Sequence, residues 1–162
     1  MDIFCKFCGT KHAAPSYPKQ CINCDNITWI NPLPVAVLLQ PVRDGPRIGI
    51  LIGERGIEPM KGSYGLPGGY IDCSDRDIIS AARREFFEEI GFEAPPADHM
   101  QLFSSYSDGR CMLTFVKSFL AISLDDLERF VPNDECPAIR VAWEPERLCF
   151  HSHTEALAKY FK

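Results

Sequence analysis

The sequence predicts an α+β fold preceded by a small metal-binding module, and three observations support this prediction. Two C-x-x-C pairs lie near the N-terminus, several short apolar runs follow them, and one amphipathic segment comes after a glycine-rich stretch. The module is expected at residues 1–30 and the main domain at residues 35–162. Residues 31–34 contain two prolines, which favour an extended linker and prevent a helix.

The paired cysteines are the strongest feature of the N-terminal region. Cys5 and Cys8 form one pair, and Cys21 and Cys24 form the other. Each pair can occupy one edge of a tetrahedron, so the two pairs supply all four ligands of a structural Zn²⁺. The metal would provide folding energy that this short polar segment lacks, and a zinc ribbon is therefore expected. Four unrelated cysteines or a redox dithiol fit the paired spacing less well. His12 is expected to be a solvated loop residue.

Composition and charge restrict the class of protein. The chain has 162 residues and is 46% hydrophobic and 24% charged, as is typical of a globular protein. It has no run of 18 apolar residues and no signal peptide pattern, so we expect no membrane contact and a cytoplasmic location. The net charge of −5 argues against electrostatic binding of nucleic acid, but it permits a phosphorylated substrate that is screened by cations. The cysteines outside the ribbon lack metal-ligand spacing and are expected to be buried; they are Cys73, Cys111, Cys136 and Cys149.

Short apolar runs indicate the strands of the main domain. Residues 35–41 and 47–53 flank an Asp-Gly turn signal and are expected to pair as a hairpin. Further strands are expected at residues 100–106, 111–122 and 139–143. Ser152 and Glu155 have the spacing of a capping box, which predicts a C-terminal helix through Tyr160. This helix explains His151 and His153 as helix-terminus residues better than as ligands of a second metal.

An amphipathic helix is predicted after the glycine-rich residues 62–70. Ser74 is the expected N-cap, Asp77 the third helical residue, and Gly91 the residue just past the end. Glycines before a helix permit positive φ angles and a close approach of the backbone to a ligand.

Three glutamates on this helix, Glu85, Glu88 and Glu89, form a strip beside its apolar face. Like charges three or four residues apart each destabilise a helix by a few tenths of a kcal/mol, and Arg84 relieves only part of this. Clustered carboxylates suit Mg²⁺ or Mn²⁺. A solvated acidic helix face is the alternative, and it fits less well because the strip borders the core face and follows a glycine loop.

Residues 69–92 resemble the Nudix box, G-x5-E-x7-R-E-U-x-E-E-x-G-U, in which U is an apolar residue. The second half matches position for position from Arg84 onward, and the Leu-Pro-Gly-Gly that ends at Gly69 is typical of its lead-in. The resemblance implies an α/β/α sandwich with a mixed β-sheet. A zinc ribbon before a Nudix domain is found in NADH pyrophosphatases and in shorter relatives.

The first half of the box departs from the pattern, because the segment from Gly69 to Arg84 is one residue longer. Counting forward puts Asp75 at the position of the first glutamate, and counting back puts Arg76 there. That acid supports the site in the family, so Asp75 is the candidate substitute, although its side chain is shorter than that of glutamate.

The resemblance also implies Mg²⁺- or Mn²⁺-dependent hydrolysis of a diphosphate bond. Arg84 would orient the glutamates, and either Glu85 or Glu135 in a later loop would be the base for the attacking water. The implied metal ligands are Gly68 (through its carbonyl), Glu85, Glu88 and Glu89.

The resemblance leaves the substrate open. ADP-ribose or another nucleotide sugar is favoured and a nucleoside triphosphate is next, because no S-Q-P-W-P-F-P-type motif of NADH pyrophosphatases follows Phe92. The alternative is a catalytically weak module that senses nucleotides or binds protein or RNA, but the ribbon carries few lysines for such a role (Lys6, Lys11 and Lys19). The resemblance also implies a homodimer, which is common in the family.

Overall fold

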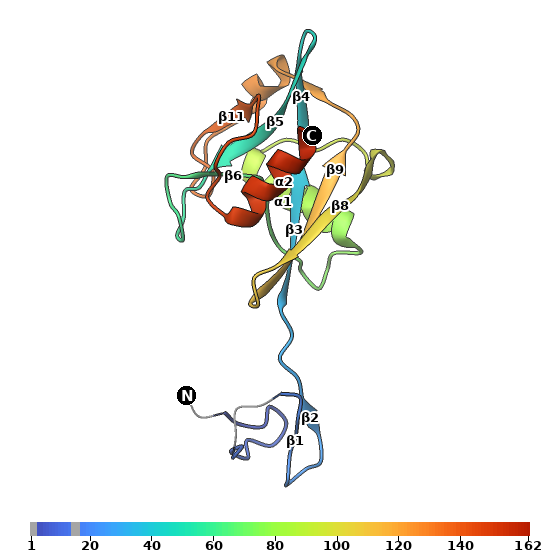
Figure 1. Cartoon of the computed structure of the whole chain (residues 1–162), viewed down its shortest axis with the longest axis vertical. Helices are drawn as coiled ribbons and strands as arrows, with labels where there is room; N and C mark the ends of the chain where they lie inside the picture. The colour runs from blue at the N-terminus through green and yellow to red at the C-terminus, as the bar shows by residue number, and fades with distance from the viewer. Residues whose placement is uncertain (1–2, 14–16) are drawn as a thin grey trace. The chain divides into compact units, whose positions relative to one another are not determined.

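The computed structural model describes residues 3–13 and 17–162, which fall into two compact units (Figure 1). The first unit ends at Pro32, and the second begins with Leu33. None of the helices in these described residues has both the length and the apolar character needed to span a bilayer.

The first unit is built from two similar turns and a short antiparallel pair, β1 (Lys19–Gln20) and β2 (Ile27–Thr28). In each turn the first cysteine of a pair accepts a hydrogen bond from the residue four positions later. Gly9 N–H donates to the Cys5 carbonyl at 2.8 Å, and Asp25 N–H donates to the Cys21 carbonyl at 2.9 Å. Both donors have positive φ angles, +73° and +56°, so the two turns share one backbone conformation.

His12 corrects one expectation for this unit. The sequence predicts a solvated loop residue, whereas the side chain is buried and only 8% exposed. Its Nε2 has no hydrogen-bond partner, and it does not belong to the cysteine cluster described below. A single histidine in a polar loop carries no sequence signal for burial, because burial depends on how the two turns pack.

The second unit contains two mixed sheets. One has the strand order β7-β3-β9-β8, and the other has the order β10-β4-β5-β11 with β6 paired to β5. The strands are β3 (Leu33–Leu39), β4 (Pro41–Asp44), β5 (Arg47–Glu54), β6 (Tyr64–Gly65), β7 (Gly68–Tyr70), β8 (Met100–Ser107), β9 (Cys111–Ser118), β10 (Ile122–Ser123) and β11 (Ile139–Ala142). The α-helices are α1 (Ile78–Ile90) and α2 (His151–Tyr160), and two short 3-10 helices are η1 (Ala97–His99) and η2 (Asp125–Arg129).

Alternating side chains of the strands face the two helices in turn. On β3, Ala36 and Leu38 belong to the apolar cluster that contains Phe86 of α1, whereas Val37 and Leu39 belong to the cluster that contains Leu157 of α2. Successive side chains of a strand point to opposite faces, so this division follows from the strand period. The α/β/α sandwich with mixed sheets is therefore confirmed, and β3 runs through its centre (Figure 1).

The predicted hairpin of residues 35–41 with 47–53 is wrong in its first half. The apolar run is divided at Gln40: its first part is β3 in one sheet, and its last residue, Pro41, begins β4 in the other. Only β4 forms a hairpin with β5. The predicted strand 111–122 is divided in the same way, into β9 and β10. The two segments that connect the sheets are hydrogen-bonded to each other: the side-chain amide of buried Gln40 donates to the Leu120 carbonyl at 2.9 Å.

The predicted helix is confirmed, but α1 begins at Ile78, three residues later than a helix capped by Ser74 would begin. Ser74 does not cap it, because both its N–H and its hydroxyl donate to Asp72 Oδ1 within the preceding turn. Asp77 is the N-cap and forms a reciprocal capping box with Ser80. The C-terminal prediction is confirmed: Gly91 has φ +84° and donates its N–H to the Phe87 carbonyl.

The capping box predicted for the C-terminal helix is wrong. Helix α2 begins at His151, and its N-cap, Phe150, provides no side-chain hydrogen bond. Thr154 of the first turn instead accepts from Leu148 N–H at 3.0 Å. The burial predicted for the remaining cysteines is confirmed for Cys136, whereas Cys111 and Cys149 are half-buried and Cys73 is exposed in the turn before α1.

Candidate active site

Asp75 and Arg84 form the best-defined ion pair beside the glutamate strip. Arg84 donates from Nε and Nη2 to the two oxygens of Asp75 at 3.0 and 2.8 Å, and the Asp75 side chain is only 5% exposed. The hydrogen bonds from Arg84 lower the pKa of Asp75 and more than offset the effect of burial. Arg76 lies outside this contact, since its side chain is 86% exposed and pairs with Asp77. Asp75 and Arg76 were the two residues that could occupy the position of the first glutamate of the box. Of these two, Asp75 is the one that pairs with Arg84.

The other side of the Arg84 guanidinium contacts the glutamates. Its Nη1 donates to Glu85 and to Glu88, each at 2.8 Å. The pKa of Arg84 is raised, mainly because of the Asp75 contact, so this guanidinium carries a permanent charge. One arginine therefore contacts three carboxylates, that of Asp75 in the turn before α1 and those of Glu85 and Glu88 in the second half of α1, and the group retains negative charge.

The two glycines of β7 allow the backbone to lie against the glutamates. A Cβ on Gly69 would lie 2.7 Å from Cδ of Glu85, and a Cβ on Gly68 would lie 2.6 Å from Cα of Val37 on β3. Gly68 has φ +155° and donates its N–H to Glu89 Oε2 at 3.2 Å. A side chain at either glycine would displace β7 from the acidic strip or from its partner strand.

Two of the glutamates are destabilised as anions. Burial raises the pKa of Glu89 to about 8, and the Gly68 N–H only partly offsets it. Burial also raises the pKa of Glu85 despite the contact with Arg84. Carboxylates that are desolvated close to one another suit a hard divalent cation, because the cation neutralises both. The donor set therefore fits Mg²⁺ or Mn²⁺.

The glutamates are not arranged as a finished metal cage. Within residues 3–13 and 17–162, only the four ribbon cysteines place three or more potential ligand atoms within 4.8 Å of one another. Glu88 points to Arg84 and its side chain is 49% exposed. A metal bound by Glu85, Glu88 and Glu89 together would require their carboxylates to move closer to one another.

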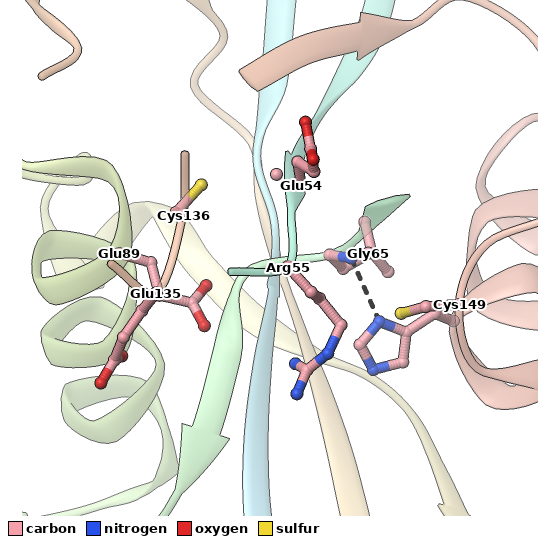
Figure 2. A pocket seen from close by; sticks show the side chains of 10 residues that line it. Glu54, Arg55, Gly65, Glu89, Glu135, Cys136 and Cys149 are labelled. Atoms are coloured by element: carbon pink, nitrogen blue, oxygen red, sulfur yellow. Dashed lines mark hydrogen bonds between the residues drawn. The ribbon is translucent and has the colours of Figure 1, made fainter. Parts of the chain in front are cut away.

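A pocket lies next to the glutamate strip (Figure 2). Glu89 and Glu135 lie on one side of it and Cys149 on the other, with the Arg55 side chain between them. Arg55 donates its Nε to the Pro59 carbonyl at 2.8 Å. This arginine was not singled out in the sequence, because a lone cation after a strand gives no signal of its position.

His153 also lines this pocket, and it is more than the helix-terminus residue predicted from the sequence. It is 5% exposed, and its Nδ1 accepts the Leu66 N–H at 3.1 Å. Burial lowers its pKa to about 3, so the ring is neutral and serves as an acceptor. His153 therefore anchors the segment that leads into β7, and only the fold reveals the contact because the partners are 87 residues apart.

The ribbon cysteines form a compact four-sulfur cluster. The Sγ atoms of Cys5 and Cys24 are 3.7 Å apart, and those of Cys8 and Cys21 are 3.6 Å apart. Sulfurs bound to one tetrahedral zinc at 2.3 Å would be about 3.8 Å apart. Their positions therefore match the ligand set of a closed, structural metal site.

Comparisons with family models, curated proteins and solved structures all find NUDIX proteins. The NUDIX domain family model matches residues 32–159. The chain belongs to the NUDIX family. Over 63 residues it is 40% identical to the Nudix hydrolase NudL of Salmonella paratyphi B. That match covers 38% of this chain and 32% of the relative, so the chain spans about a third of the length of these curated relatives.

Two solved NUDIX structures illustrate the likeness in fold. The NUDIX hydrolase from Nitrosomonas europaea is 22% identical with a TM-score of 0.64, and the match covers 98% of this chain and 89% of that one. A bifunctional NMN adenylyltransferase/ADP ribose pyrophosphatase from Francisella tularensis, in complex with AMP and a Mn ion, is 22% identical with a TM-score of 0.51. In that case the match covers 68% of this chain and 34% of the other.

The Asp75–Arg84 pair leads to a first prediction. Asp75→Asn keeps the size of the side chain but removes its charge, so Arg84 loses its fixed orientation toward the glutamates. We expect kcat/KM for the hydrolysis proposed below to fall by about tenfold, or ~1.4 kcal/mol. Asp72→Asn is the matched control in the same turn, because the Asp72 side chain accepts hydrogen bonds from Ser74 and not from Arg84, and it should stay within about twofold of the parent. Equal losses in the two variants would contradict the prediction.

Proposed function

We propose that this chain is a metal-dependent pyrophosphohydrolase that cleaves the diphosphate of a nucleoside-diphosphate compound. The observation that carries the proposal is the acidic strip of α1, in which Glu85 and Glu89 are desolvated side by side against the glycines of β7. Membership of the NUDIX family supports the same chemistry.

Glu85, Glu88 and Glu89, together with the carbonyl of Gly68, would hold Mg²⁺ or Mn²⁺. The metal, when bound, would neutralise charge on the diphosphate as water attacks phosphorus. Arg84 keeps Glu85 and Glu88 oriented, and Asp75 in turn fixes Arg84. Glu85 and Glu135 are the two candidates for the base that accepts the proton of the water.

For the ribbon we propose a structural Zn²⁺ held by Cys5, Cys8, Cys21 and Cys24. The sulfur spacings described above and the all-thiolate donor set support zinc over Mg²⁺, which prefers oxygen ligands.

ADP-ribose or a related nucleotide sugar is the proposed substrate class. The supporting comparison is the Francisella tularensis protein, whose described activity is ADP ribose pyrophosphatase and whose structure holds a Mn ion. The pocket beside Glu89 contains a cation, Arg55, which can bind an anionic group of such a substrate.

The proposal is tested with purified protein, Mg²⁺ and a panel of substrates. The panel contains ADP-ribose, nucleotide sugars, NADH, dinucleoside polyphosphates and nucleoside triphosphates, and the products are separated by chromatography. We expect cleavage of ADP-ribose or a nucleotide sugar that stops in EDTA and falls at least about a hundredfold in Glu88→Gln. Nucleotide binding without turnover of any compound would contradict the proposal and favour a sensing module.

A further inference from the structure

We infer that Asn133 is a positioning residue that holds Glu135 against the end of α1, an inference that rests on the proposed function. Asn133 lies in the loop between η2 and β11. Its Nδ2 donates to the carbonyls of Glu89 and Glu88 at 3.0 and 3.5 Å. Its Oδ1 accepts the N–H groups of Glu135 and Cys136 at 3.0 and 2.8 Å. One amide thus joins the loop of Glu135 to the helix turn that carries two of the proposed metal ligands.

The helix end needs such a partner. The last carbonyls of an α-helix have no donor within the helix. At the end of α1 the cap N–H of Gly91 is used by the Phe87 carbonyl. The amide of Asn133 supplies donors to the next carbonyls along the chain, so it completes the cap from a distant segment.

The backbone of Glu135 is also fixed from the opposite side. Its carbonyl accepts the Gly56 N–H at 2.7 Å, just after β5. A Cβ on Gly56 would lie 2.7 Å from the carbonyl carbon of Asp134, so the close contact requires glycine there. With its N–H held by Asn133 and its carbonyl by Gly56, Glu135 has a defined backbone position between α1 and β5.

Glu135 is exposed and lines the same pocket as Glu89 (Figure 2). Its charge is close enough to add to the burial that raises the pKa values of Glu85 and Glu89. A carboxylate in this position can turn toward a water molecule near the glutamates without any movement of the backbone. Asn133 would contribute to hydrolysis only through this placement, because it does not line the pocket.

The chemistry of asparagine suits the task. The side-chain amide has two N–H donors for the two helix carbonyls and a carbonyl oxygen that can accept from both loop N–H groups. Aspartate would keep the acceptor, but it would lose the donor and place a negative charge at the negative end of the helix. Asn133→Asp therefore tests the hydrogen bonds to the helix carbonyls. Asn133→Ala removes these bonds and also the hydrogen bonds from the loop N–H groups.

The experiment is a double-mutant cycle on kcat with the best substrate of the panel, using the full chain. The variants are Asn133→Ala, Glu135→Gln and the double variant, with Asn133→Asp in parallel. We expect Asn133→Ala and Asn133→Asp each to lower kcat by about tenfold, and Asn133→Ala to have no further effect when Glu135 is already glutamine. Asp134→Ala is the matched control in the same loop and should leave kcat unchanged.

Two measurements separate positioning from general stability. Hydrogen exchange at the Glu135 and Cys136 amides should become faster in Asn133→Ala, while the amides in the middle of α1 keep their protection. Additive effects in the cycle, or unchanged exchange at Glu135, would overturn the inference while wild-type turnover still supports the proposed function. Absence of turnover in the wild type would instead overturn the proposed function itself, and the role of Asn133 in hydrolysis with it.

Discussion

Glu89→Gln is expected to abolish most of the hydrolysis, by about a thousandfold in kcat/KM, which corresponds to ~4 kcal/mol. Glu89 is the half-buried glutamate of α1 that lines the pocket and whose carboxylate accepts the Gly68 N–H. Glutamine keeps the acceptor for that N–H, so the fold is retained. It lacks the charge that a divalent metal requires, so Mn²⁺ affinity should fall together with activity.

The same substitution should stabilise the metal-free protein. A buried carboxylate without a counter-ion lowers stability, and an uncharged amide of the same size avoids this penalty. We therefore expect Glu89→Gln to unfold at a higher temperature than the wild type in EDTA at pH 8.5, and the difference to shrink or reverse when Mn²⁺ is added. Glu93→Gln, an exposed glutamate just past α1, is the control. Lower stability in EDTA would contradict the role of Glu89 as a desolvated anion.

Cys21→Ser is the second substitution with a large expected effect, and it acts on the other unit. Cys21 is fully buried, its Sγ is 3.6 Å from that of Cys8, and its carbonyl closes the second turn of the ribbon. Apparent binding free energies of structural zinc in small modules are about 10–16 kcal/mol, so loss of one ligand should leave residues 3–32 unfolded. The main domain has its own core, and its NMR signals should be preserved.

The measurements for this variant are metal content and NMR spectra. The wild type should contain about one zinc per chain by elemental analysis, and Cys21→Ser should contain almost none. Cys73→Ser is the matched control, because Cys73 is exposed and lies outside the cluster. A variant that lost the metal but kept the dispersed signals of the ribbon would show that the metal is not structural.

Features that depend on local sequence were predicted well. The paired cysteines, the helix that carries Glu85 and Glu89, and the glycine at its end all follow from spacing, because a turn or a helix places residues at fixed intervals. The apolar runs also predicted the strands β3, β5, β8, β9 and β11.

Features that depend on contacts between distant segments were not predicted. The choice between Asp75 and Arg76 depends on the turn that Asp72 and Ser74 form, which a count along the chain does not include. His153 meets Leu66 only after α2 has packed, and its place in the sequence predicted no more than a residue at the start of a helix. Asn133 contacts residues 44 and 45 positions earlier, so no local pattern distinguishes it from its neighbours in the loop.

The crossing of two strands between the sheets has a consequence for motion. β3 continues into β4 and β9 continues into β10 next to the Gln40–Leu120 hydrogen bond, and the chain also passes between the sheets from β6 to β7. A hinge that opened one sheet away from the other would have to break both cores at once, because β3 contributes to each. Substrate entry is therefore expected to depend on rearrangement of surface loops such as residues 55–63, on a rigid platform of strands.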